Sequence, residues 1–454
     1  MAMTSMNPAT GETLARFDPW GEAELEQALS QAADARALWT ALPMERRCAL
    51  MREAAAVLRR RADQLGSLIT REVGKLHREA RAEVEKSALV CDYYAEHGPG
   101  FLADEAIDSD AGKSLVAYQP LGTVLAVMPW NFPFWQVFRF AAPALVAGNT
   151  GVLKHASNVP QSALAIEEVF REAGFPEGVF RTLMIGAAQV ERVIDDPRIA
   201  AVTLTGSEPA GRQVAARAGQ QIKPSVLELG GSDPFIVLDD ADLELAVEQA
   251  VASRFLNSGQ SCIAAKRFIL TPGIADAFVE RFRDEVAELT VGDPMDEATR
   301  IGPMARADLR DELHEQVRDS IDAGAEAVIG CAVPPGDGAF YPASILDRVQ
   351  PGMRAWDEEF FGPVAIVIRV GDEEEAVRVA NDSRFGLGGS VWTADSERGE
   401  AIARRLECGS AFVNGMVKSD PRLPFGGIKA SGYGRELSAH GIREFVNAKT
   451  IWVR

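Results

Sequence analysis

TVLAVMPW (residues 123–130) is the first of five short apolar or β-rich runs that decide the fold. The others are TGVLKHA (150–156), VFRTLMI (179–185), IAAVTLTG (199–206) and SVLELGG (225–231). Helical segments such as QSALAIEEVFREAG (161–174) separate them, so strand and helix alternate. These strands are too apolar for burial on one face only. The alternation therefore predicts a parallel sheet covered by helices on both faces.

A second alternating region lies downstream, from about residue 232 to residue 430. Its apolar runs include PFIVL (234–238), AAKRFIL (264–270) and GPVAIVIRV (362–370), with helical stretches between them. No low-complexity linker interrupts the chain, so we expect a second α/β domain packed against the first. Ligands of such sheets bind beyond the carboxyl ends of the strands, and the site should be sought there.

The composition is that of a soluble globular protein. The 454 residues exceed the size at which one hydrophobic core keeps growing, so at least two domains are expected. Hydrophobic residues make up 47% and charged residues 25%, and no apolar run approaches the ~20 residues of a membrane helix. The N-terminus shows no secretory pattern, which predicts a cytoplasmic location. A net charge of −19 argues against nucleic-acid binding, because phosphate contacts need clustered basic residues.

The cysteine and histidine patterns argue against a disulfide framework and against a metal site. The chain has an odd number of cysteines, and no two of them form a CxxC pair. The five are Cys48, Cys91, Cys262, Cys331 and Cys408. The five histidines are widely spread and form neither HxH nor HExxH. We therefore expect reduced thiols and metal-free chemistry.

Three polar side chains stand out where strands or turns end. Cys262 lies in NSGQSCIAAKRF (257–268), whose approach is small and polar, although a half-buried structural thiol is the commoner case. Glu228 ends the strand in LELGG and, if desolvated, could act as a base; an ion pair with a lysine is the alternative. Asn131 in MPWNFPFW could donate to an oxyanion, or could simply be a turn asparagine.

GSEPAGR (206–212) follows a strand and opens a helix, so it could hold an anion. Ser207 and the free N–H groups of the first turn would face a negative charge at the positive end of the helix. The string is not a Walker loop, and the sequence contains no GxGxxG. An ordinary capped helix is the alternative interpretation.

Seven motifs occur in one order along the chain: PWNFP, VLKHAS, TGS, LELGG, GQSC, EEFFGP and LPFGGIKASGYGRE. With them the chain resembles the aldehyde dehydrogenase superfamily over nearly its whole length. The resemblance implies NAD(P)-dependent oxidation of an aldehyde to a carboxylic acid by a homodimer or homotetramer. It also implies a Rossmann-like cofactor domain, an α/β catalytic domain and a small β oligomerisation element. The expected boundaries are 1–103 with 121–231 (cofactor), 232–430 (catalytic), and 104–120 with 442–454 (oligomerisation).

The resemblance also implies roles for single residues. Cys262 matches the nucleophile of the family. Asn131 and the Cys262 backbone N–H match the groups that donate hydrogen bonds to the oxyanion. Glu228 matches the base that activates water for thioester hydrolysis. The positions that match cofactor contacts are Trp130, Lys154, Ser157, Gly206, Ser207, Glu359 and Phe361.

The substrate is expected to be succinic semialdehyde, because the resemblance is greatest to shorter bacterial succinate-semialdehyde dehydrogenases. Arg139 and Ser419 match positions that hold the substrate carboxylate, and the alternative for Arg139 is a salt bridge on a helix surface. Leu256 stands where some relatives carry a second arginine. A broader-specificity aliphatic or other semialdehyde dehydrogenase is therefore an alternative.

NADP is expected to be preferred over NAD. Ser157 stands where NAD-preferring relatives often carry a glutamate that would repel a 2′-phosphate, and Lys154 adds a nearby positive charge. The alternative is that Ser157 only caps the following helix. Two other functions are disfavoured: an inactive structural homologue would not need Cys262, Glu228 and Asn131, and a coenzyme A-acylating enzyme would not need Glu228.

Overall fold

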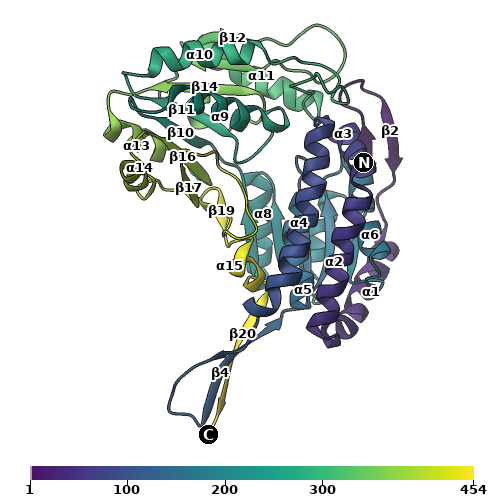
Figure 1. Ribbon diagram of the computed structural model, residues 1–454. Coiled ribbons are helices and arrows are strands. Elements are labelled where there is room, and N and C mark those ends of the chain that lie inside the picture. The colour runs from purple at the N-terminus through teal and green to yellow at the C-terminus, as the bar shows by residue number, and fades with distance from the viewer. Residues whose placement is uncertain (1–2) are drawn as a thin grey trace.

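The computed structural model describes residues 3–454, which form two α/β units and a projecting β arm (Figure 1). The sheet of the first unit has the order β19-β9-β8-β5-β6-β7, with β19 antiparallel and the others parallel. Its strands are β5 (Thr123–Met128), β6 (Thr150–His155), β7 (Phe180–Thr182), β8 (Ile199–Thr205), β9 (Ser225–Glu228) and β19 (Gly432–Tyr433). The parallel sheet predicted from the five apolar runs is confirmed.

Helices cover both faces of this sheet, as the apolar strands require. They are α1 (Glu22–Ala41), α2 (Met44–Arg60), α3 (Ala62–Val73), α4 (His77–Phe101), α5 (Trp135–Ala147), α6 (Pro160–Glu172), α7 (Val190–Asp195) and α8 (Glu208–Gln220), with the short 3-10 helix η1 (Ala187–Gln189). Val124 and Ala126 of β5 pack in the core shared with α2, α4, α5 and α6. Leu125, between them, points to the opposite face and packs with α1, α7 and α8.

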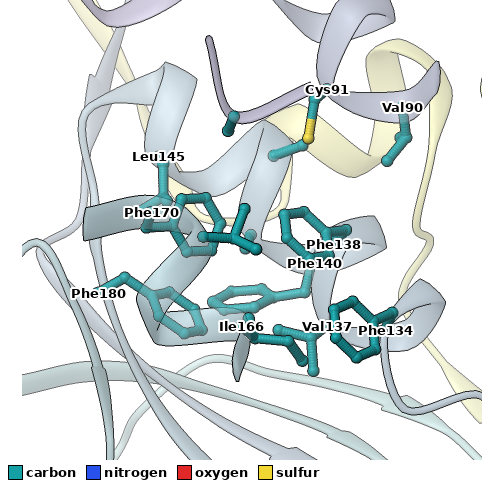
Figure 2. Packing of buried hydrophobic residues seen from close by; sticks show 14 of the residues in the cluster. Val90, Cys91, Phe134, Val137, Phe138, Phe140, Leu145, Ile166, Phe170 and Phe180 are labelled. Carbon is teal, nitrogen blue, oxygen red and sulfur yellow. The ribbon is translucent and has the colours of Figure 1, made fainter. Parts of the chain in front are cut away.

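Aromatic side chains fill the larger of these two cores (Figure 2). Phe138 of α5 lies 5.1 Å from Phe170 of α6, measured between ring centroids, and Phe170 lies 4.7 Å from Phe180 of β7. Cys91 is buried in the same core, where burial raises the pKa of its thiol well above the usual range. Cys91 is therefore a packing residue.

The second unit contains a sheet of order β12-β13-β14-β11-β10-β16-β17, parallel except for the edge strand β12. Its strands are β10 (Asp233–Val237), β11 (Ala265–Leu270), β12 (Glu326–Ile329), β13 (Ser344–Asp347), β14 (Val364–Arg369), β16 (Gly388–Trp392) and β17 (Ser410–Val413). Its helices are α9 (Leu243–Phe255), the 3-10 helix η2 (Leu256–Gly259), α10 (Ala275–Ala287), α11 (Ala307–Asp322), α12 (Arg354–Asp357), α13 (Glu373–Asn381) and α14 (Ser396–Ala403). Separate cores lie on its two faces.

The remaining strands form smaller elements. β3 (Glu105–Ala106), β4 (Lys113–Pro120) and β20 (Val446–Val453) make an antiparallel arm that extends from the body and carries the C-terminus near its tip (Figure 1). The other elements are the hairpin β1 (Met3–Met6) and β2 (Thr13–Phe17), the pair β15 (Phe385–Gly386) and β18 (Ile428–Lys429), and α15 (Ser438–Arg443). Within residues 3–454, no helix has the length and apolar character needed to span a bilayer.

Candidate active site

The first sheet has its topological switch point between β5 and β8. The chain starts at β5, adds β6 and β7 on one side, and then returns to add β8 and β9 on the other. The loops after β5 and β8 consequently diverge and leave a crevice, which is the usual ligand site of such sheets. A cleft of about 610 Å³ lies there, bordered by Trp130 and Asn131 from the first loop and by Gly206 and Ser207 from the second.

Residues of the second unit close the other side of this cleft. Glu359 and Phe361 line it, and the Phe361 ring stands edge-on to Trp130, with centroids 5.8 Å apart. Ser207 is the N-cap position of α8, and among the described residues its hydroxyl makes no capping hydrogen bond. Glu208 in the first helical turn is neutralised by arginines, with Arg384 at 2.6 Å. The helix N-terminus therefore keeps its capacity for an anion.

The loop that carries Cys262 makes an unusual left-handed turn. Asn257 and Ser258 have φ values of 53° and 52°, and Gly259 follows at 72°. The Asn257 side chain holds this conformation by donating to the Asn131 carbonyl oxygen at 2.8 Å. A Cβ atom at Gly259 would collide with the Gly362 carbonyl oxygen, so glycine is required there. The turn redirects the chain just before Cys262.

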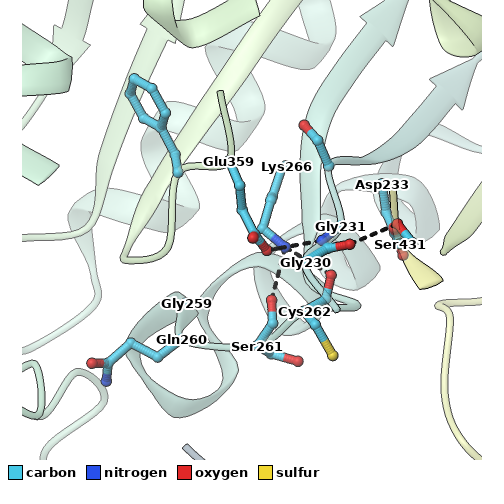
Figure 3. Close-up of polar contacts among 12 residues, drawn as sticks. Gly230, Gly231, Asp233, Gly259, Gln260, Ser261, Cys262, Lys266, Glu359 and Ser431 are labelled. Atoms are coloured by element: carbon cyan, nitrogen blue, oxygen red, sulfur yellow. Dashed lines mark hydrogen bonds and ion pairs between the residues drawn. The ribbon is translucent and has the colours of Figure 1, made fainter. Parts of the chain in front are cut away.

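A buried lysine also holds this loop in place. Lys266 at the start of β11 donates to the carbonyl oxygens of Ser261 and Cys262, each at 2.8 Å, and its ammonium lies 3.1 Å from Glu359 Oε1. The same Glu359 oxygen accepts a hydrogen bond from the Gly231 N–H at 3.1 Å. Figure 3 shows these contacts and the Cys262 sulfur pointing away from them. Lys266 therefore anchors the backbone of the loop while the thiol faces the cavities.

The two glycines of LELGG permit this close packing. A Cβ at Gly230 would collide with Glu359 Oε2, and a Cβ at Gly231 would come within 2.7 Å of the Cys262 carbonyl oxygen.

Cys262 and Glu228 are both strongly desolvated. Burial raises the pKa of the Cys262 thiol to about 12, against the opposing effect of Lys266 and Arg139. The fraction of Cys262 in the thiolate form should therefore rise with pH. Burial, and then the neighbouring Glu436, raise the pKa of Glu228 well above its usual range. Neither Glu228 oxygen has a hydrogen-bond partner within the described chain.

Asn131 is held rigidly beside the cysteine loop. Its side-chain amide donates to the Gln260 carbonyl oxygen at 3.1 Å, and its side-chain oxygen accepts from Gln136 Nε2 at 3.1 Å. An amide carries two N–H donors, and these contacts use one of them. The other makes no hydrogen bond within residues 3–454. Asn131 lies in a bend, and it is buried, with a side chain that bridges two segments.

A second cavity, of about 220 Å³, meets the cleft at Cys262. Cys262 and Gln136 border both cavities. The second cavity is lined by apolar side chains and by Arg139 and Ser419, the two positions predicted for the substrate. Within it Arg139 forms an ion pair with Glu436, and its guanidinium lies 4.6 Å from the centroid of the Phe425 ring. The ion pair of the alternative interpretation exists, but it is buried and not on a helix surface.

Lys154 and Ser157 lie apart from these residues, at the carboxyl end of β6. Lys154 is buried, and burial lowers the pKa of its ammonium group. Ser157 is exposed. The alternative that Ser157 caps the next helix is wrong, because the N–H groups of Gln161 and Ser162 at the start of α6 donate to the Glu72 carboxylate at 3.1 and 2.9 Å.

Sequence reasoning missed three residues of the site. The sequence could have indicated Lys266, since a charged residue within an apolar strand is buried and needs a partner. Glu436 is the last residue of the motif LPFGGIKASGYGRE, but the motif predicted no role for it. Nothing in the sequence indicated that Lys86 belongs to the site, because α4 carries many charged residues and a lysine among them is usually solvated. All three lie close to Cys262, Glu228 or the second cavity.

Comparison with known proteins places this site in a family. The family described as "Aldehyde dehydrogenase family" matches residues 1–451. The chain therefore belongs to the aldehyde dehydrogenase family, as the motif resemblance predicted.

Individual relatives show which enzymes of this family are similar to the chain. The chain is 52% identical over 453 residues, covering 100% of both chains, to a probable succinate-semialdehyde dehydrogenase [NADP(+)] of Synechocystis sp.. It is 50% identical over 449 residues, 99% of this chain and 97% of the other, to a succinate semialdehyde dehydrogenase [NAD(P)+] of Escherichia coli. A solved structure of succinic semialdehyde dehydrogenase from Streptococcus pyogenes in complex with NADP+ matches with a TM-score of 0.98, 39% identity and 100% coverage of both chains.

Proposed function

We propose that this protein oxidises succinic semialdehyde to succinate with NADP as the preferred cofactor. The observation that carries the proposal is the position of Cys262 at the junction of two cavities, one at the switch point of the first sheet and one lined by basic and hydroxyl side chains. The names of relatives with about half of their residues identical to this chain support the same substrate and cofactor.

The residues of the larger cleft fit a dinucleotide. The uncapped N-terminus of α8 with Ser207 suits the pyrophosphate, and the Trp130 and Phe361 rings suit a flat heterocycle. Glu359 suits a ribose hydroxyl, and Lys154 with Ser157 would take the adenosine ribose and its phosphate. When bound, the nicotinamide supplies the acceptor for a hydride.

Cys262 is proposed to act as the nucleophile. Its thiol gives its proton to water, the sulfur attacks the aldehyde carbon, and the oxygen of the resulting thiohemiacetal accepts hydrogen bonds from the Asn131 amide and the Cys262 backbone N–H. Loss of hydride leaves a thioester. Lys266 fixes the two carbonyl groups of the loop, so the sulfur and the backbone N–H stay in place during attack.

Glu228 is proposed to complete the cycle as a general base. Its raised pKa and lack of hydrogen-bond partners in the described chain suit a carboxylate that takes a proton from water as water attacks the thioester. Succinate leaves and the free thiol is restored. An assay of the product with and without coenzyme A checks that water is the acceptor.

The substrate proposal is tested by steady-state kinetics with succinic semialdehyde and butanal, which have the same chain length. The carboxylate of succinic semialdehyde can contact Arg139 and Ser419 in the second cavity, whereas the methyl end of butanal cannot. A clear excess in kcat/KM for the semialdehyde is expected. Equal values would contradict the substrate proposal and favour a broad aliphatic specificity.

The cofactor preference is expected to reverse in Ser157→Glu. A carboxylate at this exposed position would repel a 2′-phosphate but could accept a hydrogen bond from a 2′-hydroxyl. We expect kcat/KM for NADP to fall at least ~10-fold, equivalent to about 1.4 kcal/mol, while activity with NAD is kept or improved. The ratio of kcat/KM values for the two cofactors measures the effect.

Ser157→Gln is the matched control, because glutamine has the size of glutamate without its charge. It should lower kcat/KM for NADP much less than Ser157→Glu does. A wild-type preference for NAD, together with an unchanged ratio in Ser157→Glu, would refute the role of Ser157.

We also propose that the arm makes a subunit contact in a homodimer or homotetramer. Trp452 and Val453 on β20 are 51% and 50% exposed, which is high for such apolar residues in a single chain. Trp452→Asp should weaken self-association by about 30-fold or more, as the loss of an interface aromatic does. Leu38→Asp, at an exposed position on α1, is the control and should leave the mass measured by light scattering unchanged. A wild-type monomer would refute the proposal.

A further inference from the structure

Lys86 on α4 is a partly buried basic group of the second cavity, and within residues 3–454 it has no carboxylate partner, whereas the other unpaired lysine of this cavity, Lys418, is exposed. Its ammonium donates to Ser419 Oγ at 2.8 Å and lies 4.3 Å from the centroid of the Trp135 ring. Within residues 3–454, no acidic side chain forms an ion pair with it. A partly buried cation that contacts only a hydroxyl and a ring keeps most of its attraction for an anion.

The acidic side chains that border the same cavity are already engaged. Glu83 forms an ion pair with buried Lys75 and accepts hydrogen bonds from the first N–H groups of α5, at 2.8 Å from Phe134 and 3.1 Å from Trp135. Glu79 accepts a hydrogen bond from the Asn257 N–H at 3.0 Å. These contacts hold both carboxylates away from a role as counterion for Lys86.

Arg139 differs from Lys86 in this respect. Its guanidinium is paired with Glu436, and both side chains are buried. An arginine whose charge is balanced by a buried glutamate offers less net attraction to a second carboxylate. Leu256, which takes the place of a second arginine, also borders the cavity and supplies no charge.

We propose that Lys86, with the hydroxyl of Ser419, binds the remote carboxylate of the substrate and sets the preference for a semialdehyde over an uncharged aldehyde. The proposal rests on the proposed function and makes it more specific. Ser419 then has two partners, accepting from the Lys86 ammonium and donating its own proton to a carboxylate oxygen. Arg139, which is paired with Glu436, has only a supporting role in binding this carboxylate.

The charges around Lys86 make its effect dependent on pH. Burial and the nearby Arg139 lower the pKa of Lys86 to about 8, with Glu83 and Asp420 opposing and Lys418 adding to the decrease. The substrate carboxylate stays ionised above pH ~6. As the pH rises through about 8, the ammonium loses its proton, so the attraction for the carboxylate is present below this pH and declines above it.

The test uses full-length Lys86→Met, which keeps the length and apolar body of the side chain. We expect KM for succinic semialdehyde to rise at least ~10-fold, the loss of a charge-assisted hydrogen bond, with kcat within about twofold. KM for butanal should not rise. Lys418→Met removes the same charge from an exposed lysine at the edge of the cavity, where solvent screens it, and should change KM for the semialdehyde by less than about threefold.

A pH series gives a second readout. The wild-type ratio of kcat/KM for the semialdehyde to that for butanal should fall between pH ~7 and ~9, whereas the ratio in Lys86→Arg should stay level because arginine remains charged. A wild-type enzyme that prefers the semialdehyde, but whose Lys86→Met variant keeps that preference, refutes the role of Lys86 alone. A wild-type enzyme without any preference refutes the proposed substrate instead.

Discussion

Cys262→Ala is expected to lower the rate of aldehyde oxidation by about 10⁴-fold or more, because alanine lacks the sulfur that is proposed to form the covalent intermediate. The substitution removes one sulfur atom at the edge of the cleft and leaves the residues around α8 intact. Binding of NADP, measured by calorimetry, should therefore stay close to that of the wild type. An alanine variant that oxidises succinic semialdehyde at a rate near wild type would contradict the mechanism.

Cys408→Ala is the matched control for this result. Cys408 is also a partly buried free thiol, but it hydrogen-bonds the Ser410 carbonyl oxygen and borders neither catalytic cavity. Its loss should change kcat/KM by less than about threefold, as expected for a substitution outside the site.

Glu228→Gln is expected to lower kcat by about 10²- to 10⁴-fold, the usual contribution of a general base. The amide keeps the size of the side chain but cannot take a proton from water. Because hydride transfer precedes hydrolysis, a stopped-flow experiment should show a burst of reduced cofactor followed by very slow turnover. Equal slowing of the burst and of the later phase would contradict a role confined to hydrolysis.

The pH dependence supplies a further check on Glu228. The carboxylate acts as a base only when deprotonated, and its pKa is raised, so wild-type kcat should fall as the pH decreases through that raised value. Glu228→Gln should lack this decrease. Glu444→Gln, which alters a nearby carboxylate that accepts a hydrogen bond from the Arg435 N–H, is the control and should retain it.

The fold could be predicted from the sequence because strand and helix alternate with little ambiguity. The five apolar runs all became parallel strands of one sheet. Several elements were not predicted, among them the N-terminal hairpin and β19, which joins the first sheet from a glycine-rich stretch without strand character. A strand of two residues gains its stability from the sheet that it joins, so local sequence carries little sign of it.

The candidate site was predictable where chemistry and local pattern coincide. Cys262, Glu228 and Asn131 follow turns or strand ends, but each local sequence alone left a structural interpretation open, and the predicted roles came from the order of the seven motifs. Lys86 lies on a long helix with many charged residues, and only tertiary packing shows that its ammonium enters a cavity. The engagement of Arg139 with Glu436 joins residues far apart in the chain, and no local pattern could indicate it.

The pairing of β9 with β19 bears on how the protein is made. Gly432 lies opposite Glu228 in this ladder, and the Leu229 N–H donates to the Ser431 carbonyl oxygen at 3.0 Å. The strand that ends in Glu228 is thus completed by a segment that leaves the ribosome after all other strands of the two large sheets. Most of both sheets can form during translation, since chains fold from the N-terminal side as they emerge. The surroundings of Glu228 are then completed after the rest of both sheets, and until that point the nascent chain exposes an unfinished sheet edge at β9.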